Sequence, residues 1–268
     1  MRPLAEFPLE KRRDIRGVFF DIDDTLTSDG KLTAEAYCAL ERLHCAGQLV
    51  VPITGRPAGW CDHIARMWPI DAVVGENGAF YFRYDKSTRR MRRRFVDTAK
   101  TRLRNRGRLQ TIGREIVKAV PGSAVAADQA YRETDLAIDF CEDVPRLSES
   151  AVDTIVTLMC ERGLTVKVSS IHVNGWFGTY DKLTMTKRLI AECHAIDLDA
   201  ERGHFVFVGD SPNDVPMFEF FPHAIGVANV AEFGPRITHA PAYVTIGRCG
   251  NGFREAADGI LAATHVTG

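Results

Sequence analysis

The sequence contains 268 residues, of which 45% are hydrophobic and 26% are charged, and its formal net charge is −1. These values are typical of a globular domain. The overall charge is too small to indicate, by itself, any particular kind of binding partner. No apolar run approaches the roughly 20 residues that a membrane-spanning helix needs, and residues 1–16 lack the apolar core of a signal peptide. The seven cysteines are scattered and never spaced as C-x-x-C, which predicts free thiols in a reducing cytoplasm.

Residues 17–20 are apolar and are predicted to form a short buried strand, which ends at Asp21, Asp23 and Asp24. Crowded carboxylates at the end of a buried strand repel one another and are costly to desolvate, and a hard cation would relieve both effects. Because alternate residues of a strand share a face, Asp21 and Asp23 are predicted to point into one site and Asp24 away from it. An Asp-rich turn that caps a helix is the alternative interpretation.

The chain then alternates between helices and strands. We predict helices over residues 33–46 and 59–67 and strands over residues 49–53 and 71–75. The strand over 49–53 leads into Thr54, Gly55 and Arg56, where a small hydroxyl residue and a glycine permit close approach to an oxyanion. This order predicts a parallel sheet wound with helices, in which ligands bind at the carboxyl ends of the strands.

Residues 83–118 break this pattern, because they contain 14 Lys and Arg against three acids in a chain that is nearly neutral. Such an asymmetry is expected of a separately evolving inserted module. In and after this run we predict a hairpin turn at 85–88, a chain that could enter a helix from Val96 onward, helices over 109–120 and 148–162, and strands over 136–140, 164–168 and 171–174. The insert is therefore predicted to be α+β, with one open antiparallel sheet.

The alternating order resumes at Lys182. We predict helices over 182–195, 215–220 and 253–262 and strands over 205–208, 224–227 and 242–245. The strand over 205–208 is fully apolar and, like the first strand, ends in acids, here Asp210 and Asp214. Two acid-bearing strand ends could therefore meet over one cation.

Four segments carry these candidate residues in order: Asp21-Ile22-Asp23-Asp24-Thr25-Leu26, Ile53-Thr54-Gly55-Arg56, Lys182 and Gly209-Asp210-Ser211-Pro212-Asn213-Asp214. In these segments the sequence resembles the haloacid dehalogenase superfamily of phosphotransferases. The resemblance implies an α/β fold with a doubly wound, Rossmann-like parallel-sheet core and an inserted α+β cap.

The length of chain between Arg56 and Lys182 places the cap there, since the stretch before Thr54 is too short for a folded insert. We predict a core catalytic domain of residues 1–83 and 180–268 and a cap domain of residues 84–179 that sets substrate specificity. This placement resembles the subgroup with Cof-like phosphatases, sucrose-phosphate phosphatase and mannosyl-3-phosphoglycerate phosphatase. Leu183 departs from that subgroup, because many Cof-like members have glycine after the lysine.

The resemblance implies that Asp21 is the nucleophile and becomes an aspartyl phosphate. It implies that Asp23 protonates the leaving alcohol and later activates water. The physical chemistry agrees, because a carboxylate attacks a phosphate dianion poorly unless Mg²⁺ and an ammonium group screen the charge.

The resemblance also assigns the groups around the nucleophile. The implied ligands of Mg²⁺ are Asp21, the backbone carbonyl of Asp23, Asp210 and Asp214, with Asn213 in support. The implied phosphate-binding residues are Thr54, Gly55 and Lys182. Taken singly, Thr54 could instead be a cap of a turn and Lys182 a solvated lysine at a helix start.

Candidates for substrate contacts from the cap side are Arg56, His172, Asn174 and Trp176. Each has a structural alternative: Arg56 could anchor its own loop, His172 could be a strand residue, Asn174 could form a turn and Trp176 could pack in a core. The arginine-rich residues 89–94 are interpreted as a solvated face, although they could attract anionic substrates.

We expect a Mg²⁺-dependent phosphatase that hydrolyses a phosphate monoester of a small metabolite, a sugar or polyol phosphate, in the cytoplasm. A phosphomutase is the alternative, because in the superfamily the carboxyl of Asp23 goes with both reactions. A nucleic-acid-binding protein that uses the basic cap is a third reading, disfavoured because few aromatic residues interleave the basic run. We expect no membrane partner, and a monomer or homodimer.

Overall fold

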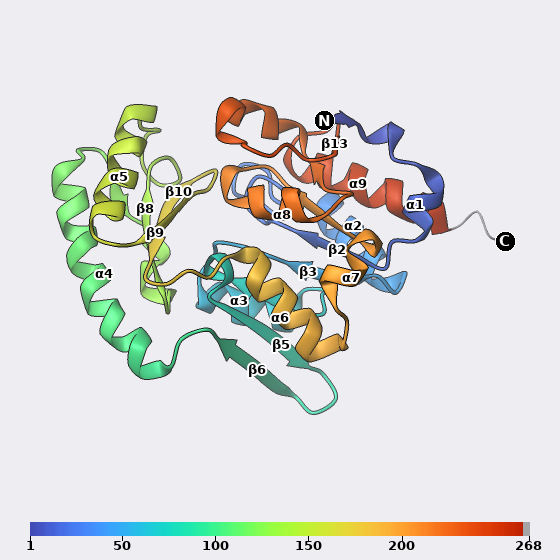
Figure 1. The fold of residues 1–268 in the computed structure, drawn as a ribbon, viewed down its shortest axis with the longest axis horizontal. Helices are drawn as coiled ribbons and strands as arrows, with labels where there is room; N and C mark the ends of the chain where they lie inside the picture. The colour runs from blue at the N-terminus through green and yellow to red at the C-terminus, as the bar shows by residue number, and fades with distance from the viewer. Residues whose placement is uncertain (265–268) are drawn as a thin grey trace.

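The computed structural model of the protein describes residues 1–264. Its centre is a six-stranded sheet in the order β1-β13-β12-β11-β2-β3 (Figure 1). The strands in that order are β1 (Arg2–Pro3), β13 (Tyr243–Val244), β12 (Ile225–Gly226), β11 (Phe205–Gly209), β2 (Gly17–Phe20) and β3 (Leu49–Pro52). Every pairing in this sheet is parallel, which confirms the predicted α/β class.

Helices cover both faces of the parallel sheet. One face packs against α2 (Ala34–Cys45), α3 (Ala58–Met67) and α9 (Cys249–Thr264), and the other against α6 (Lys182–His194), α7 (Leu198–Glu201) and α8 (Val215–Phe220). Helix α1 (Leu9–Arg13) lies against α9 and buries none of its own residues. Alternate residues of β2 enter opposite cores, with Val18 and Phe20 on the first face and Phe19 on the second. The fully apolar sequence of β2 is explained by burial on both faces.

Several helices follow an N-cap residue whose side chain accepts a hydrogen bond from a backbone N–H group in the first helical turn. Such caps are formed at α2 by Thr33, at α4 (Ala99–Ala119) by Thr98, at α5 (Glu149–Glu161) by Ser148 and at α6 by Asp181. Each cap stabilises its helix by about 0.5–2 kcal/mol. The cap at Asp181 fixes Lys182 as the first residue of α6.

A second sheet extends the core sheet at β3. It contains β4 (Val73–Gly75), β5 (Phe80–Asp85) and β6 (Arg90–Phe95), all antiparallel, and the bridge between Ile53 and Val74 joins it to the core. The carboxylate of Asp85 accepts hydrogen bonds from the backbone N–H groups of Ser87 and Thr88 and so closes the predicted hairpin turn.

Three arginines of this hairpin, Arg92, Arg93 and Arg94, have side chains about half exposed and form ion pairs with core helices. Arg93 pairs with Asp62 of α3, and Arg92 with Glu192 of α6. These contacts agree with the solvated-face interpretation of the basic run. Since the predicted domain boundary at residue 84 falls inside the hairpin, we propose that the core domain extends to the end of β6.

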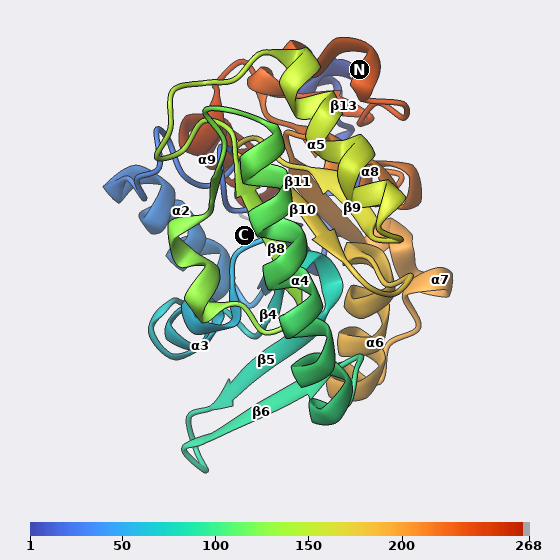
Figure 2. The same ribbon diagram turned by 90° about the vertical axis from the view of Figure 1, so that its left-hand side faces the viewer.

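The elements from α4 to β10, which we call the insert, form an open antiparallel sheet covered by two helices (Figure 2). The strand order is β7 (Ala124–Val125), β8 (Asp135–Asp139), β10 (His172–Trp176) and β9 (Thr165–Val168). Its apolar core lies between this sheet and helices α4 and α5. The predicted antiparallel sheet is confirmed. Helix α4 runs without a break from Ala99 and includes both the possible helix from Val96 onward and the helix predicted over 109–120.

Short 3-10 segments connect these elements: η1 (Leu4–Glu6), η2 (Glu76–Gly78), η3 (Ala127–Tyr131), η4 (Arg202–His204), η5 (Pro212–Asp214) and η6 (Ala228–Arg236). Among the described residues, no helix combines the length and the apolar character that crossing a membrane requires.

Gly78 is a point where the backbone of η2 touches the start of α6. Its φ is +104°, and a Cβ there would lie 2.0 Å from the carbonyl oxygen of Asp181. We therefore expect Gly78→Ala to lower the free energy of unfolding by roughly 2–4 kcal/mol, measured by urea denaturation. The control is Gly107→Ala, because Gly107 lies within α4 with open space around it, and we expect it to raise stability by about 0.5–1 kcal/mol. Equal stabilities of the two variants would contradict the predicted contact.

Candidate active site

Three buried carboxylates converge at the carboxyl ends of two neighbouring strands. Asp21 follows β2, Asp210 follows β11, and Asp214 ends η5 just beyond β11. One ligand oxygen from each lies within 4.8 Å of the others, and all three residues are at most 3% exposed. Because β2 and β11 pair in parallel, their carboxyl ends meet at one edge of the sheet.

Lys182 supplies the positive charge of this cluster. Its Nζ donates hydrogen bonds of 2.7 Å to both Asp21 Oδ1 and Asp214 Oδ1. Burial alone would lower the pKa of Lys182, but the two carboxylates outweigh it and raise that pKa. The ammonium group is therefore held charged in an interior position.

The cluster has a formal charge of −2, because three carboxylates face one ammonium group. Burial and the repulsion from Asp214 raise the pKa of both Asp21 and Asp210, against the opposing effect of Lys182 on Asp21. A divalent cation would balance this charge. The donor set of carboxylate oxygens fits Mg²⁺, which prefers hard oxygen ligands.

Asp210 and Asp214 are held in fixed orientations by further hydrogen bonds. Thr25 donates through Oγ1 to Asp210 Oδ1 at 3.0 Å, and Asn229 donates through Nδ2 to Asp210 Oδ2 at 3.2 Å. Asp214 Oδ2 accepts from the backbone N–H groups of Asp210 and Ser211. These contacts aim the carboxylates before any ligand binds, which lowers the cost of binding one.

Asp23 lies outside the carboxylate cluster and is held by Arg56. Arg56 Nε is 2.9 Å from both carboxylate oxygens of Asp23, and Nη2 is 2.7 Å from Oδ1. The expectation that Asp21 and Asp23 share a strand face is wrong in its premise, because β2 ends at Phe20 and a tight loop follows. The expectation that Asp24 points away from the site is also wrong, because Asp24 lines a cavity beside Asp210.

Thr54 and Gly55 follow β3, which lies beside β2 in the sheet. The Thr54 side chain is fully buried and accepts a hydrogen bond from the backbone N–H of Arg56. A Cβ at Gly55 would lie 3.2 Å from the side-chain nitrogen of Asn77, so glycine keeps this loop close to its neighbour. Asn213 donates from its side-chain nitrogen to Asn77 Oδ1, which ties the loop after β11 to the same place.

The candidates from the insert are placed differently from one another. His172 Nε2 lies 2.9 Å from Glu142 Oε2, near the Arg56 side chain. Asn174 donates to Asp135 Oδ2 inside the insert. Trp176 is 0% exposed and stacks on Tyr180, so it has no free surface for a substrate in this arrangement.

Sequence reasoning missed several residues that hold the site together. Asn229 and Glu142 carry no local signal, since each acts through a partner distant in the sequence. Thr25 lies within the first motif, but its bond to Asp210 depends on the pairing of β2 with β11. Spatial neighbourhood, and not spacing along the chain, identifies these residues.

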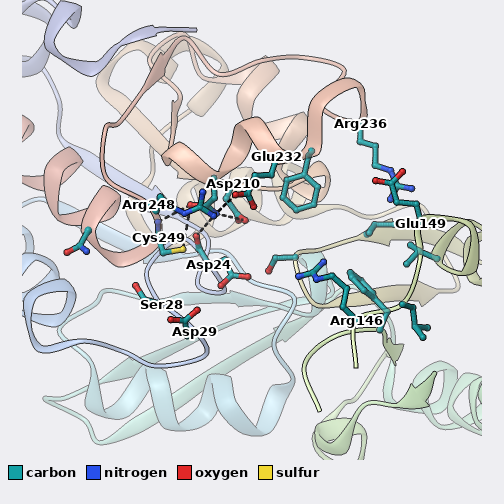
Figure 3. Close-up of a pocket in the computed structure, with 18 residues that line it drawn as sticks. Asp24, Ser28, Asp29, Arg146, Glu149, Asp210, Glu232, Arg236, Arg248 and Cys249 are labelled. Carbon is teal, nitrogen blue, oxygen red and sulfur yellow. Dashed lines mark hydrogen bonds and ion pairs between the residues drawn. The ribbon is translucent and has the colours of Figure 1, made fainter. Parts of the chain in front are cut away.

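A cavity of about 650 Å³ opens between the core and the insert beside the acidic cluster (Figure 3). Asp24, Asp210 and Arg248 line it from the core, and Arg146 lines it from the insert. A smaller cavity of about 240 Å³ is lined by Asp23, Arg56 and Glu142, among others. Together the two cavities provide space for a small molecule next to the carboxylates.

The fold is an α/β core with an inserted α+β unit, and its site carries a carboxylate cluster that suits a cation. Residues 18–102 match the family model described as haloacid dehalogenase-like hydrolase. The chain is similar to this family over those residues, and the similarity supports an enzyme of the hydrolase class.

Individual relatives cover nearly the whole chain. The phosphoglycolate phosphatase of Methanosarcina acetivorans is 29% identical over 247 residues, covering 90% of this chain and 94% of that protein. A Thermoplasma acidophilum structure gives a TM-score of 0.69 at 19% identity, covering 92% of this chain and 98% of that one. The C-terminal domain of C. albicans trehalose-6-phosphate phosphatase gives 0.67 at 14% identity, covering 95% of each chain. These similarities agree with the resemblance found in the sequence, and the solved structures confirm the predicted α/β fold.

If the acidic cluster binds Mg²⁺, the cation will stabilise the folded protein. A Mg²⁺ concentration 100-fold above its dissociation constant adds about 2.7 kcal/mol to the free energy of unfolding. This increase corresponds to a rise of roughly 5 °C in the unfolding temperature. We expect this rise in a thermal-shift assay and its loss in Asp210→Asn.

The control for that assay is Asp199→Asn, because Asp199 is an exposed acid that pairs with Lys187 outside the cluster. We expect it to keep the full Mg²⁺-dependent rise. A similar rise in Asp210→Asn would place the cation elsewhere.

Proposed function

We propose that this hydrolase is a Mg²⁺-dependent phosphatase that cleaves a phosphate monoester of a small metabolite through an aspartyl phosphate on Asp21. The observation that carries the proposal is the cluster of Asp21, Lys182, Asp210 and Asp214 at one edge of the sheet. It places a carboxylate with an ammonium group at 2.7 Å and an oxygen set that suits a divalent cation. These are the elements that in-line phosphoryl transfer to a carboxylate requires.

The proposed reaction has two steps. In the first, an oxygen of Asp21 forms a bond to phosphorus while the bond from phosphorus to the leaving oxygen breaks, and Asp23 gives its proton to that oxygen. In the second, Asp23 takes a proton from a water molecule whose oxygen attacks phosphorus, and the bond to Asp21 breaks to release phosphate. Lys182 and Thr54 hold the phosphoryl oxygens. Bound Mg²⁺, held by Asp21, the Asp23 carbonyl, Asp210 and Asp214, would neutralise charge that develops on those oxygens.

We propose that the insert acts as a cap that covers the leaving group. Its support is the cavity of about 650 Å³ between the insert and the core, which is large enough for a small metabolite and lies beside Asp210. The names of the relatives suggest two substrate types, phosphoglycolate and a sugar phosphate. A panel with phosphoglycolate, glycerol phosphate and trehalose 6-phosphate, assayed for phosphate release with Mg²⁺, tests both. An isomerised product without phosphate release would indicate a phosphomutase instead.

The proposed compartment remains the cytoplasm. Its support is that all seven cysteines are free thiols in the structure, as expected in a reducing environment.

Asp21→Asn tests the nucleophile. We expect it to reduce kcat by at least roughly 10³-fold, because a neutral amide cannot accept the phosphoryl group as a carboxylate does. Removing one of the crowded buried charges should leave the fold intact, which circular dichroism will check. A variant that keeps most of the phosphatase rate would refute the assignment.

Asp23→Asn tests acid-base catalysis. Loss of proton transfer should reduce kcat by roughly 10²–10⁴-fold on an alkyl phosphate. Steady-state kinetics on the best substrate of the panel provides the measurement. A reduction below about threefold would be inconsistent with the role of Asp23.

A further inference from the structure

A chain of contacting polar side chains runs from the insert to the proposed acid-base residue. His172 Nε2 lies 2.9 Å from Glu142 Oε2, and Glu142 Oε1 accepts a hydrogen bond of 2.7 Å from Arg56 Nη2. Arg56 in turn holds both carboxylate oxygens of Asp23. The proposed reaction uses Asp23 but gives no role to Glu142.

Glu142 is presented by a rigid loop. Asp139, which is 1% exposed, accepts hydrogen bonds of 2.7–2.8 Å from the backbone N–H groups of Cys141, Glu142 and Asp143. Asp139 ends β8 and pairs across the sheet with His172 of β10. The insert sheet therefore fixes both members of the Glu142–His172 pair in place.

Charge also favours an ionised Glu142. Burial opposes ionisation of its carboxyl group, but His172 and Arg56 outweigh burial and lower the pKa of Glu142 to about 2. The carboxylate is therefore negatively charged at neutral pH and pairs with Arg56.

Arg56 is held by protein carboxylates through its Nε and Nη2 groups. Its side chain is 5% exposed and is shared by Asp23, Glu142 and Asp128, the last at 3.5 Å from Nη1. Its guanidinium group also lies 4.4 Å from the ring centroid of Trp60. These contacts support an anchoring role for Arg56, which was the structural alternative to binding substrate.

The contacts with Arg56 determine where Asp23 points. Both Asp23 oxygens are held by one planar guanidinium group, so the carboxylate turns only when that group turns. Glu142 and Asp128 hold the guanidinium group from the side of the insert. A misplacement of a catalytic group by about 1 Å can cost roughly 10²-fold in rate.

We infer that Glu142 is a positioning residue that acts through Arg56 to orient Asp23 for proton transfer to the leaving group. The inference rests on the proposed function. The inference links the insert to proton transfer in the core, because Asp23 is correctly oriented only when the insert places Glu142 against Arg56.

The test compares two leaving groups. An alkyl phosphate from the panel needs a proton on its leaving oxygen, whereas 4-nitrophenyl phosphate releases a stable anion and needs little help. We expect Glu142→Gln to lower kcat/KM on the alkyl ester by about 10- to 100-fold, and to change kcat/KM on the aryl ester by less than about threefold. A general loss of structure would lower both values alike.

The matched control is Asp143→Asn. Asp143 is the next residue of the same loop, and within residues 1–264 its side chain forms no hydrogen bond or ion pair, so the variant removes the same charge without touching Arg56. We expect wild-type kinetics on both esters. If Glu142→Gln fails to fold, Glu142→Asp keeps the charge with a shorter reach, and we expect a smaller selective loss.

A double-mutant cycle tests the path of the effect. If Glu142 acts through Arg56, then Glu142→Gln will add less than about twofold to the loss caused by Arg56→Lys alone. An equal loss on both esters, no loss on the alkyl ester, or an additive double variant would overturn the inference. Absence of phosphate release by the wild-type enzyme from every ester would instead refute the proposed function.

Discussion

The contact between the Lys182 ammonium group and the carboxylates of Asp21 and Asp214 is the interaction on which the site depends. Both distances are 2.7 Å, and all three residues are buried. A buried carboxylate without a partner would cost several kcal/mol, so the lysine makes the cluster compatible with a folded core. Its position is fixed by the cap at Asp181 and by the close approach of Gly78 to the start of α6.

A second set of buried polar contacts seats the insert on the core. Glu76 is fully buried and accepts hydrogen bonds from the backbone N–H groups of Ala58, Glu133 and Thr134, so one core carboxylate holds both parts. Arg132 of the insert donates to the carbonyl oxygen of Gly55 in the loop after β3. The loops that carry the proposed chemistry are therefore in direct contact with the unit proposed to select the substrate.

Much of this arrangement could be predicted from the sequence, because the signals are local. Apolar runs that end in acids predict β2 and β11, and the caps at Thr33 and Ser148 mark helix starts. The sequence marks the start of α4 only weakly, because its first turns are polar and arginine-rich, and the guanidinium group of Arg102 covers Phe95 there. The pairing of β1 with β13 was missed, since two residues carry no periodicity. Likewise, the bonds that orient Asp23 and Asp210 join residues distant in the sequence, so spacing alone could not reveal them.

In the proposed reaction, Asp21 accepts a phosphoryl group beside a divalent cation. The most direct measurement is mass spectrometry of the enzyme quenched in acid during turnover of its best substrate with Mg²⁺. We expect a phosphoryl group on the peptide that contains Asp21, absent when Mg²⁺ is chelated. A phosphoryl group on any other residue, or turnover that never phosphorylates the enzyme, would contradict the account.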